Sequence, residues 1–192
     1  MKPEEVINEF KKTDALLEGH FQLTSGLHSS VYLQCARVLQ YPDKAGQFGQ
    51  AIAHRFENQG IALVASPAIG GIVIGHEVAR ALGARFVWTE RESGKMTLRR
   101  GFTITPGEKT LVVEDVITTG GSTRETIETL RAAGADVVGA ASIIDRSNGE
   151  ADVSVPRIAL ASLKVASVDP NACDACKLGD TAVKPGSRGD ST

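Results

Sequence analysis

One stretch of the sequence, residues 110–123, limits the possible folds more than any other. It reads TLVVEDVITTGGST: apolar and β-branched residues run into two adjacent acids, Glu114 and Asp115, and a loop of hydroxyls and glycines follows. The next residues, RETIETLRAAG, have the apolar periodicity of a helix. The stretch therefore predicts a buried strand with an acidic end, then a short loop and a helix N-terminus.

The loop has the chemistry of an anion-binding site. Free backbone N–H groups, hydroxyls and the positive end of the helix dipole would all point into it. A phosphate monoester is the expected guest, and the two carboxylates beside it are placed to hold a sugar diol, directly or through a metal ion. The loop is neither a Walker A loop nor a GxGxxG loop, because no lysine follows its glycines and the glycines are adjacent.

A purely structural explanation covers only part of this loop. Ser122 with Glu125 three positions later is a capping-box pattern, so the alternative is a capped helix after a buried strand, with two solvated acids. A capping box needs one hydroxyl, whereas the loop also offers those of Thr118, Thr119 and Thr123. The excess of hydroxyls favours ligand binding.

Length and composition fit one globular domain. The chain has 192 residues, of which 42% are hydrophobic and 23% charged, and its formal net charge is −2. This charge gives no support for a nucleic-acid surface, and no apolar run approaches the roughly 20 residues of a membrane span. The N-terminus, MKPEEVINEFKK, lacks the apolar core of a signal peptide. We therefore expect a cytoplasmic protein that binds neither nucleic acid nor membranes.

Strands and helices are predicted to alternate along most of the chain. Besides the helix after residue 123, helices are expected over 4–18, ending at Gly19, over 42–59, ending at Gly60, and over 72–82, ending at Gly83. Besides the strand at 110–113, apolar runs typical of buried parallel strands are 61–66, 84–88, 135–145 and 157–165. The alternation predicts an α/β fold with a doubly wound, mainly parallel sheet.

The two ends of the chain differ from this pattern. Near the N-terminus, β-like runs at 21–24 and 31–35 flank a Ser25-Gly26 turn. After residue 168 the composition shifts to Pro, Gly, Asp and Ser, and residues 184–192 are expected to be poorly ordered. We therefore predict one domain over 1–168 and a C-terminal tail over 169–192.

Several polar segments follow predicted strands. SPAIGG, at 66–71, has no large side chain before Ile69, so a ligand could approach its backbone closely. Asp145-Arg146 ends another strand, as the acid pair does. Ligands of doubly wound sheets bind outside the carboxyl ends of strands, near the topological switch point. We therefore expect these segments to surround one site.

A basic segment, TERESGKMTLRRGF at 89–102, also follows a predicted strand. It has little apolar content and glycines at 94 and 101, and its cations are Arg91, Lys95, Arg99 and Arg100. Such a composition predicts an exposed, mobile loop at the same edge of the sheet.

The cysteines and histidines give no complete metal motif. The three cysteines do not form a disulfide framework, although Cys173 and Cys176, in CDAC, could supply half of a structural zinc site. The histidines are scattered without metal-ligand spacing, at His20, His28, His54 and His76. With no second pair to complete four ligands within one chain, we predict reduced, non-catalytic thiols. A metal shared between subunits is the alternative.

Residues 112–123, VVEDVITTGGST, resemble the signature of the type I phosphoribosyltransferases, which bind 5-phosphoribosyl 1-diphosphate. Within that family, FQLTSGLHS and Asp145-Arg146 resemble the orotate phosphoribosyltransferases, and CDACKLGDTAVKPGSR resembles the tail of a bacterial, Thermus-like subgroup. The resemblance implies the type I fold, with a hood formed by about residues 1–40 and a strand at 157–168. It also implies transfer of phosphoribosyl to orotate, giving orotidine 5-monophosphate and pyrophosphate in de novo pyrimidine biosynthesis.

The resemblance implies a role for each segment of the site. Those implied to bind 5-phosphoribosyl 1-diphosphate are Glu114, Asp115, Val116, Ile117, Thr118, Thr119, Gly120, Gly121 and Ser122. In that set the acids would face the ribose hydroxyls, Asp115 also being catalytic, and the loop would hold the 5-phosphate. The pyrophosphate loop, where the family often has a cis non-proline peptide, would comprise Ala68, Ile69, Gly70 and Gly71. Orotate would meet Thr118, Arg146 and, in the hood segment 24–33, the ring of Tyr32.

The basic segment is implied to act on the leaving group. Arg91 and Lys95 fit the family pattern RKxxKxH, whereas Glu92 replaces its second basic residue and Thr97 its histidine. We predict that Lys95 is the principal leaving-group residue. In the family this loop reaches the neighbouring subunit's site, which implies a homodimer. Mg²⁺ is the implied cofactor, held mainly through the substrate diphosphate rather than by direct protein ligands.

Two other functions stay open. The first is a nucleotide-sensing regulator of the same fold, and the intact acid pair, hydroxyl loop and basic segment favour catalysis over it. The second is transfer to another base, because the motif constrains the ribose phosphate better than the base. The chain also departs from many family members in having Thr24 and Gly70 where they have lysines.

Overall fold

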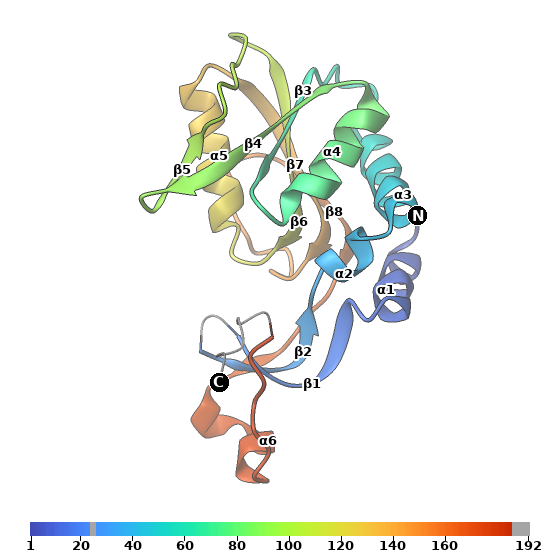
Figure 1. Cartoon of the computed structure of the whole chain (residues 1–192), viewed down its shortest axis with the longest axis vertical. Coiled ribbons are helices and arrows are strands. Elements are labelled where there is room, and N and C mark those ends of the chain that lie inside the picture. Colours follow the sequence, from blue (N-terminus) through green and yellow to red (C-terminus); the bar gives the residue numbers. More distant parts are fainter. Residues whose placement is uncertain (24–25, 186–192) are drawn as a thin grey trace.

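The computed structural model of the chain describes residues 1–23 and 26–185. Its main body is a six-stranded sheet (Figure 1). From edge to edge the strands are β5 (Lys95–Leu98), β4 (Arg85–Glu92), β3 (Leu63–Pro67), β6 (Lys109–Ile117), β7 (Asp136–Asp145) and β8 (Arg157–Ser162). Neighbouring strands are parallel except β4 and β5. The predicted doubly wound, mainly parallel α/β fold is confirmed.

The direction of winding reverses between β3 and β6. From β3 the chain crosses through α4 (Gly71–Leu82) to β4 on one side, whereas from β6 it crosses through α5 (Gly121–Ala132) to β7 on the other. Adjacent strands whose connections leave in opposite directions define a topological switch point. The residues that follow β3 and β6 therefore lie where doubly wound sheets bind their ligands.

Alternation along the strands separates two apolar cores. Val64 and Val113 face the side covered by α3 (Pro42–Ala53) and α4, and all of these side chains share one core. Leu63 and Val112 face the opposite side and pack with Ile127 of α5. Figure 1 shows α3 and α4 on one side of the sheet and α5 on the other. Burial on both faces explains the continuous apolar runs of the strands.

A second sheet forms the hood. Its three antiparallel strands are β1 (Leu16–Gln22), β2 (His28–Leu33) and β9 (Ser167–Val168). Two helices, α1 (Pro3–Lys12) and α2 (Ala36–Leu39), connect it to the core on the α3 side. The described part of the tail, residues 169–185, contains the 3₁₀ helix η1 (Pro170–Ala172) and helix α6 (Asp174–Lys177), and lies against the hood (Figure 1). Among the described helices, none has the length and apolar character of a membrane span.

The prediction of one helix over residues 4–18 is wrong beyond α1. The helix ends at Thr13, and Asp14 takes a positive φ of 50°. Leu16 and Leu17 continue the helical spacing, but they lie in β1, opposite Leu33 and Tyr32 of β2. Pairing with a strand distant in the sequence has overridden the local periodicity, and Gly19 lies inside the strand rather than ending a helix.

The expected basic loop is also wrong in form, because it is a β-hairpin. The chain turns at Ser93 and Gly94, both with positive φ, and Glu90 then pairs with Thr97. The edge strand β5 has only four residues, KMTL, and lacks the apolar run of a buried strand. We call residues 89–101 the basic hairpin.

The strand predicted at 157–168 is divided between the two sheets. β8 pairs with β7 in the large sheet, and only β9 belongs to the hood. Residues 163–166 connect them. Two further expectations fall on positions outside the described residues: Thr24 and Ser25 of the N-terminal turn, and 186–192 of the C-terminal end.

Candidate active site

A cavity of about 590 Å³ lies between the hood and the carboxyl ends of the large sheet. The hood contributes Tyr32, and the large sheet contributes Asp115, Thr118, Thr119 and Arg146. These side chains come from three segments that are separate in the sequence. The structure thus brings the predicted sugar, phosphate and base residues to one cavity.

The helix N-terminus beside the cavity is open to a ligand. Gly120 is the residue before α5 and has a φ of 76°, and no side chain caps the helix. A Cβ at Gly120 would lie 2.8 Å from Cγ1 of Val153, so glycine is required for space as well as for conformation. The uncapped N–H groups and the helix dipole favour an anion at this position.

The capping box predicted at Ser122 and Glu125 is wrong. Ser122 is the second residue of α5 rather than its cap, and Glu125 instead forms an ion pair of 2.9 Å with Arg91. Thr118 and Thr119 are exposed, as Ser122 is, but Thr123 is buried against the core at 2% exposure. Three of the four predicted hydroxyls therefore remain available, and residues 118–122 are called the anion loop below.

The acid pair, Glu114 and Asp115, lies at the end of β6 with its two members in different surroundings. Glu114 is 8% exposed, and burial raises its pKa well above the usual value, with a further rise from the charge of Asp115. Asp115 lines the cavity, and its Oδ1 accepts a 2.8 Å hydrogen bond from the N–H of Val116. A buried carboxylate beside a second one is poised to receive hydroxyl donors or a cation.

The turn after β3 packs directly on this acid pair. Ala68–Ile69 is a cis non-proline peptide, as the resemblance implied, and Ile69 is 84% exposed. A Cβ at Gly70 would lie 2.9 Å from both carboxylate oxygens of Asp115, and one at Gly71 would lie 3.1 Å from Oε1 of Glu114. The two glycines therefore allow the backbone of the turn to approach the carboxylates.

Arg146 presents an unsatisfied cation to the cavity. Its Nε is buried and has no hydrogen-bond partner among the described residues, and burial lowers the pKa of its guanidinium. The neighbouring Asp145 does not neutralise it, because that carboxylate pairs with Arg157 at 3.0 Å and accepts from Ser147 at 2.6 Å. A carboxylate ligand in the cavity would supply the missing partner.

One cavity residue, Cys35, was not predicted from the sequence. Its thiol is 97% shielded, and burial raises its pKa well above the usual value, with additional rises from the nearby charge of Asp115. Cys35 follows the strand that carries Tyr32, so the sequence predicts that it lies near the hood. Its contact with the acid pair depends on the tertiary fold, and the sequence does not predict it.

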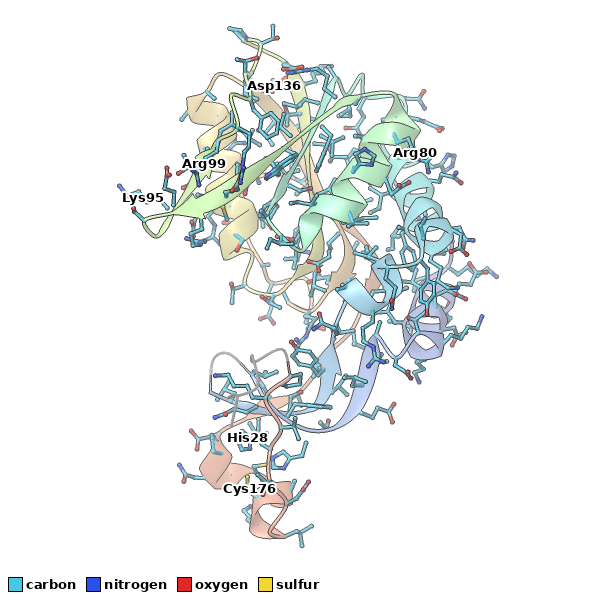
Figure 2. All side chains as sticks on the ribbon, viewed as in Figure 1. His28, Arg80, Lys95, Arg99, Asp136 and Cys176 are labelled. Carbon is cyan, nitrogen blue, oxygen red and sulfur yellow. The ribbon has the colours of Figure 1, made fainter. Side chains whose placement is uncertain are left out.

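The basic hairpin does not reach the cavity of its own chain. Figure 2 shows Lys95 and Arg99 at the side edge of the large sheet, and none of the residues lining the cavity comes from the hairpin. Arg91 pairs with Glu125, while Arg99 and Arg100 pair with Glu90. The ammonium of Lys95, by contrast, has no acidic partner within the described ranges 1–23 and 26–185.

Comparison with known sequences gives a consistent result. Residues 39–170 match the family model described as a phosphoribosyl transferase domain. The orotate phosphoribosyltransferase of Desulforamulus reducens is 55% identical over 188 residues, which cover 98% of each chain. That of Pelotomaculum thermopropionicum is 54% identical, covering 98% of this chain and 99% of its own.

Solved structures share the fold. The orotate phosphoribosyltransferase of Aeropyrum pernix superposes with a TM-score of 0.67 at 27% identity, covering 82% of this chain and 93% of its own. The adenine phosphoribosyltransferase of Thermoanaerobacter pseudethanolicus superposes with a TM-score of 0.59 at 16% identity, covering 69% and 88%. The second likeness shows that one fold serves relatives named for different bases.

Proposed function

This chain belongs to the phosphoribosyltransferase family, and we propose that it transfers the 5-phosphoribosyl group of 5-phosphoribosyl 1-diphosphate to orotate. The products are orotidine 5-monophosphate and pyrophosphate, in the pyrimidine pathway to UMP, and the enzyme acts in the cytoplasm. One observation carries the choice of base: Arg146, whose buried Nε has no partner among the described residues, lines the same cavity as Asp115. Orotate is a base with a carboxylate, and adenine is not.

The phosphoribosyl diphosphate binds at the topological switch point, beside the residues that follow β3 and β6. Its 5-phosphate binds the uncapped N-terminus of α5 through the backbone N–H groups and hydroxyls of the anion loop. Its ribose hydroxyls face Glu114 and Asp115. Its diphosphate lies against the backbone of residues 68–71, which the two glycines bring next to the acid pair. These three contacts fix the orientation of the sugar, so that its anomeric carbon faces Arg146.

Orotate occupies the hood side of the cavity. Its carboxylate pairs with the guanidinium of Arg146, and Tyr32 and Thr118 contact the ring. Because the guanidinium is already partly desolvated, the ion pair is stronger than one formed in water. A neutral base would leave the buried charge without a partner, and the site would reject it for that reason.

The acid pair fits Mg²⁺, since carboxylate oxygens are its preferred protein ligands and a nearby cation would relieve the buried charge of Glu114. Held mainly through the substrate diphosphate, Mg²⁺ supplies charge neutralisation to the departing pyrophosphate. The chain's own residues orient the sugar and the base. No general base is needed, because orotate can bind with its attacking nitrogen already deprotonated.

Bond breaking at the anomeric carbon runs ahead of bond making, so negative charge builds on the pyrophosphate. Stabilising that charge is the task of the basic hairpin, and Lys95 is the cation best placed for it, because its ammonium lacks an acidic partner among the described residues. Since the hairpin lies at the side edge of the sheet and does not line its own cavity, we assign it to the site of a second subunit in a homodimer (Figure 2). Its closure there would exclude water.

A comparison of five bases, each supplied alone, tests the assignment of orotate as the substrate. The protein is incubated with Mg²⁺, 5-phosphoribosyl 1-diphosphate and one of orotate, adenine, guanine, xanthine or uracil, and pyrophosphate release is measured. Release with orotate alone is expected. Release of pyrophosphate with a purine or uracil instead would show that the enzyme is specific for another base. Binding of the sugar diphosphate without release of pyrophosphate would show that the protein is a non-catalytic sensor.

A further inference from the structure

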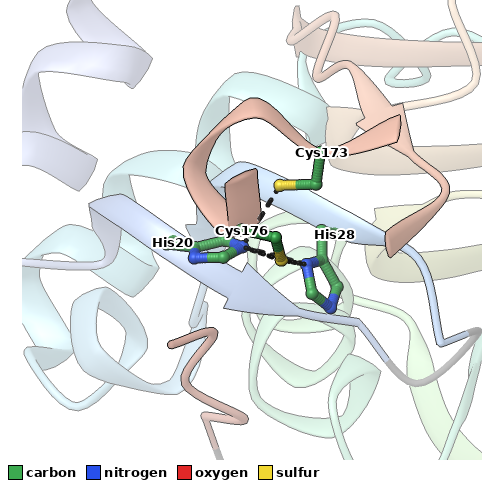
Figure 3. A group of neighbouring side chains, drawn as sticks. All are labelled: His20, His28, Cys173 and Cys176. Carbon is green, nitrogen blue, oxygen red and sulfur yellow. Dashed lines mark hydrogen bonds between the residues drawn. The ribbon is translucent and has the colours of Figure 1, made fainter. Parts of the chain in front are cut away.

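Two histidines of the hood and two cysteines of the tail converge on one point (Figure 3). His20 lies on β1 and His28 on β2, while Cys173 directly precedes α6 and Cys176 lies within it. One ligand atom from each residue lies within 4.8 Å of all the others. The prediction that no histidine completes the CDAC pair within one chain is therefore wrong, because folding brings both histidines to it.

The distances within this Cys/His cluster match those of a tetrahedral zinc site. Nε2 of His20 lies 2.9 Å from Nδ1 of His28, and the sulfur–nitrogen distances are 3.3, 3.7 and 3.2 Å. Zinc bonds of about 2.3 Å to sulfur and 2.0–2.1 Å to nitrogen imply tetrahedral edges of ~3.3 Å between nitrogens and ~3.6 Å between sulfur and nitrogen. These four distances lie within about 0.4 Å of those edges, and the two remaining pairs of ligand atoms lie no more than 4.8 Å apart.

The donor set also identifies the metal class. Two thiolates and two imidazoles form one of the ligand combinations of closed, structural zinc sites. All three cysteines of the chain are free thiols, and Cys173 is buried. Oxygen-preferring Mg²⁺ would not select this set, so the site is chemically distinct from the acid pair.

A carboxylate lies behind the first histidine. The side chain of His20 is 7% exposed, and its Nδ1, on the ring side away from the cluster, is buried without a hydrogen bond. Oδ2 of Asp180 lies 3.3 Å from that nitrogen. A carboxylate that accepts a proton from the outer nitrogen of a metal-bound histidine orients the ring and strengthens the metal bond.

The tail has little else to hold it in place. Cys173 is the only buried residue between 169 and 185, whereas Leu178 is 88% and Val183 60% exposed. Beyond the cluster, the backbone of Val183 makes two hydrogen bonds of 2.8 Å with the strand that carries His20. So small an apolar contact area contributes little to the free energy of folding, and a metal ion would account for the ordered path of the tail.

We propose that His20, His28, Cys173 and Cys176 bind one structural zinc ion that fastens the tail to the hood. The ion crosslinks β1, β2 and the segment that follows β9. Because β2 and Ser167 of β9 also line the active-site cavity, zinc fixes the strands that cover the base. The proposal concerns the stability of the hood and does not depend on which base the enzyme uses.

Metal analysis of the full-length protein, purified under reducing conditions without chelators, tests the proposal. Elemental mass spectrometry should find about one zinc ion per chain. The double variant Cys173→Ser/Cys176→Ser should lose it, while His54→Gln/His76→Gln, with the exposed histidines changed, should retain it. Zinc retained by the double cysteine variant, or absent from a wild-type protein supplied with zinc, would overturn the proposal.

Cobalt substitution provides a readout that does not require a variant to fold. Wild-type protein stripped by a chelator and reloaded with Co²⁺ should show the intense visible bands of tetrahedral cobalt and a thiolate charge-transfer band. Octahedral cobalt, without that band, would contradict the assignment. A disulfide between Cys173 and Cys176 in protein that cannot be loaded would also contradict it.

A pair of aspartates in the same tail gives a matched test of the supporting carboxylate. Asp180→Asn should weaken zinc binding about 10- to 100-fold in a competition with a chromogenic chelator. Asp174→Asn removes the same charge from an exposed carboxylate that pairs with Lys177, and should leave the affinity unchanged. Equal losses of zinc affinity in the two variants would show that Asp180 acts only through its negative charge and does not orient His20.

Discussion

The anion loop and the Cys/His cluster are built from opposite arrangements of the chain. Glu114, Asp115 and the anion loop occupy nine consecutive positions, so one strand–loop–helix unit holds them. In the cluster, each cysteine lies 148 to 156 positions from the histidine it contacts. The anion loop and acid pair are therefore positioned by local structure at the end of a buried strand. The Cys/His cluster forms only when the two ends of the chain have come together.

This difference has a physical consequence for stability. β6 is buried between two cores, whereas the tail exposes most of its side chains. Elements with few buried apolar contacts open at low free-energy cost unless another interaction holds them. We therefore expect the active-site edge of the sheet to be rigid without ligands, and the hood and tail to depend on zinc.

The largest expected effect comes from Lys95, a cation that does not line the cavity of its own chain. Lys95→Ala should lower turnover by about 10²–10³-fold, or roughly 3–4 kcal/mol, because a charge-stabilising donor to the leaving group is lost. The melting temperature should not change, since Lys95 is exposed. Steady-state kinetics and thermal unfolding measure the two, with Lys11→Ala on α1 as an exposed control.

Mixed dimers separate action across subunits from action within one. Lys95→Ala and Arg146→Gln proteins are each impaired alone. If Lys95 acts on the neighbouring site, a heterodimer contains one site with both residues intact, so mixing should restore activity. Mixtures that stay as inactive as their components would place the hairpin over its own cavity and contradict the assignment.

Zinc removal should have the next largest effect, and only on one of the two regions. At a zinc concentration 100 times the dissociation constant, the ion stabilises the closed tail by about 2.7 kcal/mol. Chelation should therefore raise hydrogen exchange in β1 and residues 169–185, while the amides of β6 and β7 stay protected. Equal deprotection of both regions would show that the hood and the large sheet unfold as one unit.

The two regions also show what the sequence could and could not predict. The strand, acid pair and loop at 110–123 were readable because a local apolar run, adjacent acids and helix periodicity reinforce one another. The capping-box prediction fails because α5 begins directly after Gly120, which has a positive φ, so that Ser122 already lies inside the helix. The doubly wound fold followed from the same kind of local pattern, repeated along the chain.

Contacts between distant segments were beyond such patterns. Residues 16–22 form β1 because they pair with β2, and the spacing of apolar residues along the chain does not predict that pairing. The same holds for the basic hairpin, whose second strand has few apolar residues. His20 and His28 have no metal-ligand spacing along the sequence, whereas the pairing of β1 with β2 brings them together in the fold.

A smaller effect is expected at the base. Arg146→Gln should raise the KM for orotate about 10- to 100-fold, since one charge-assisted hydrogen bond contributes about 1.5–3 kcal/mol. Binding of 5-phosphoribosyl 1-diphosphate should change little, because the anion loop lies on another segment. Calorimetric titration of each substrate separates the two effects. Equal weakening of both would mean that Arg146 organises the whole cavity rather than the base alone.

The smallest effect has an unusual sign, because one active-site residue is expected to cost stability. Burial raises the pKa of Glu114, so ionising it at pH 7 opposes folding, and this cost is absent below the usual pKa of a glutamate. Glu114→Gln should therefore raise the melting temperature at pH 7, by about 2–4 °C for each 1 kcal/mol relieved, while weakening binding of the sugar diphosphate.

Glu108, just before the same strand, gives the opposite case. A hydrogen bond from Arg85 lowers its pKa, so its ionised form stabilises the fold above the usual glutamate pKa, and this stability is lost as the pH falls through the lowered value. Glu108→Gln should therefore lower the melting temperature at pH 7, and both shifts should shrink toward pH 4. A lower melting temperature for both variants at pH 7 would show that Glu114 is stabilised by its neighbours, and that the active-site edge of the sheet carries no electrostatic cost for its function.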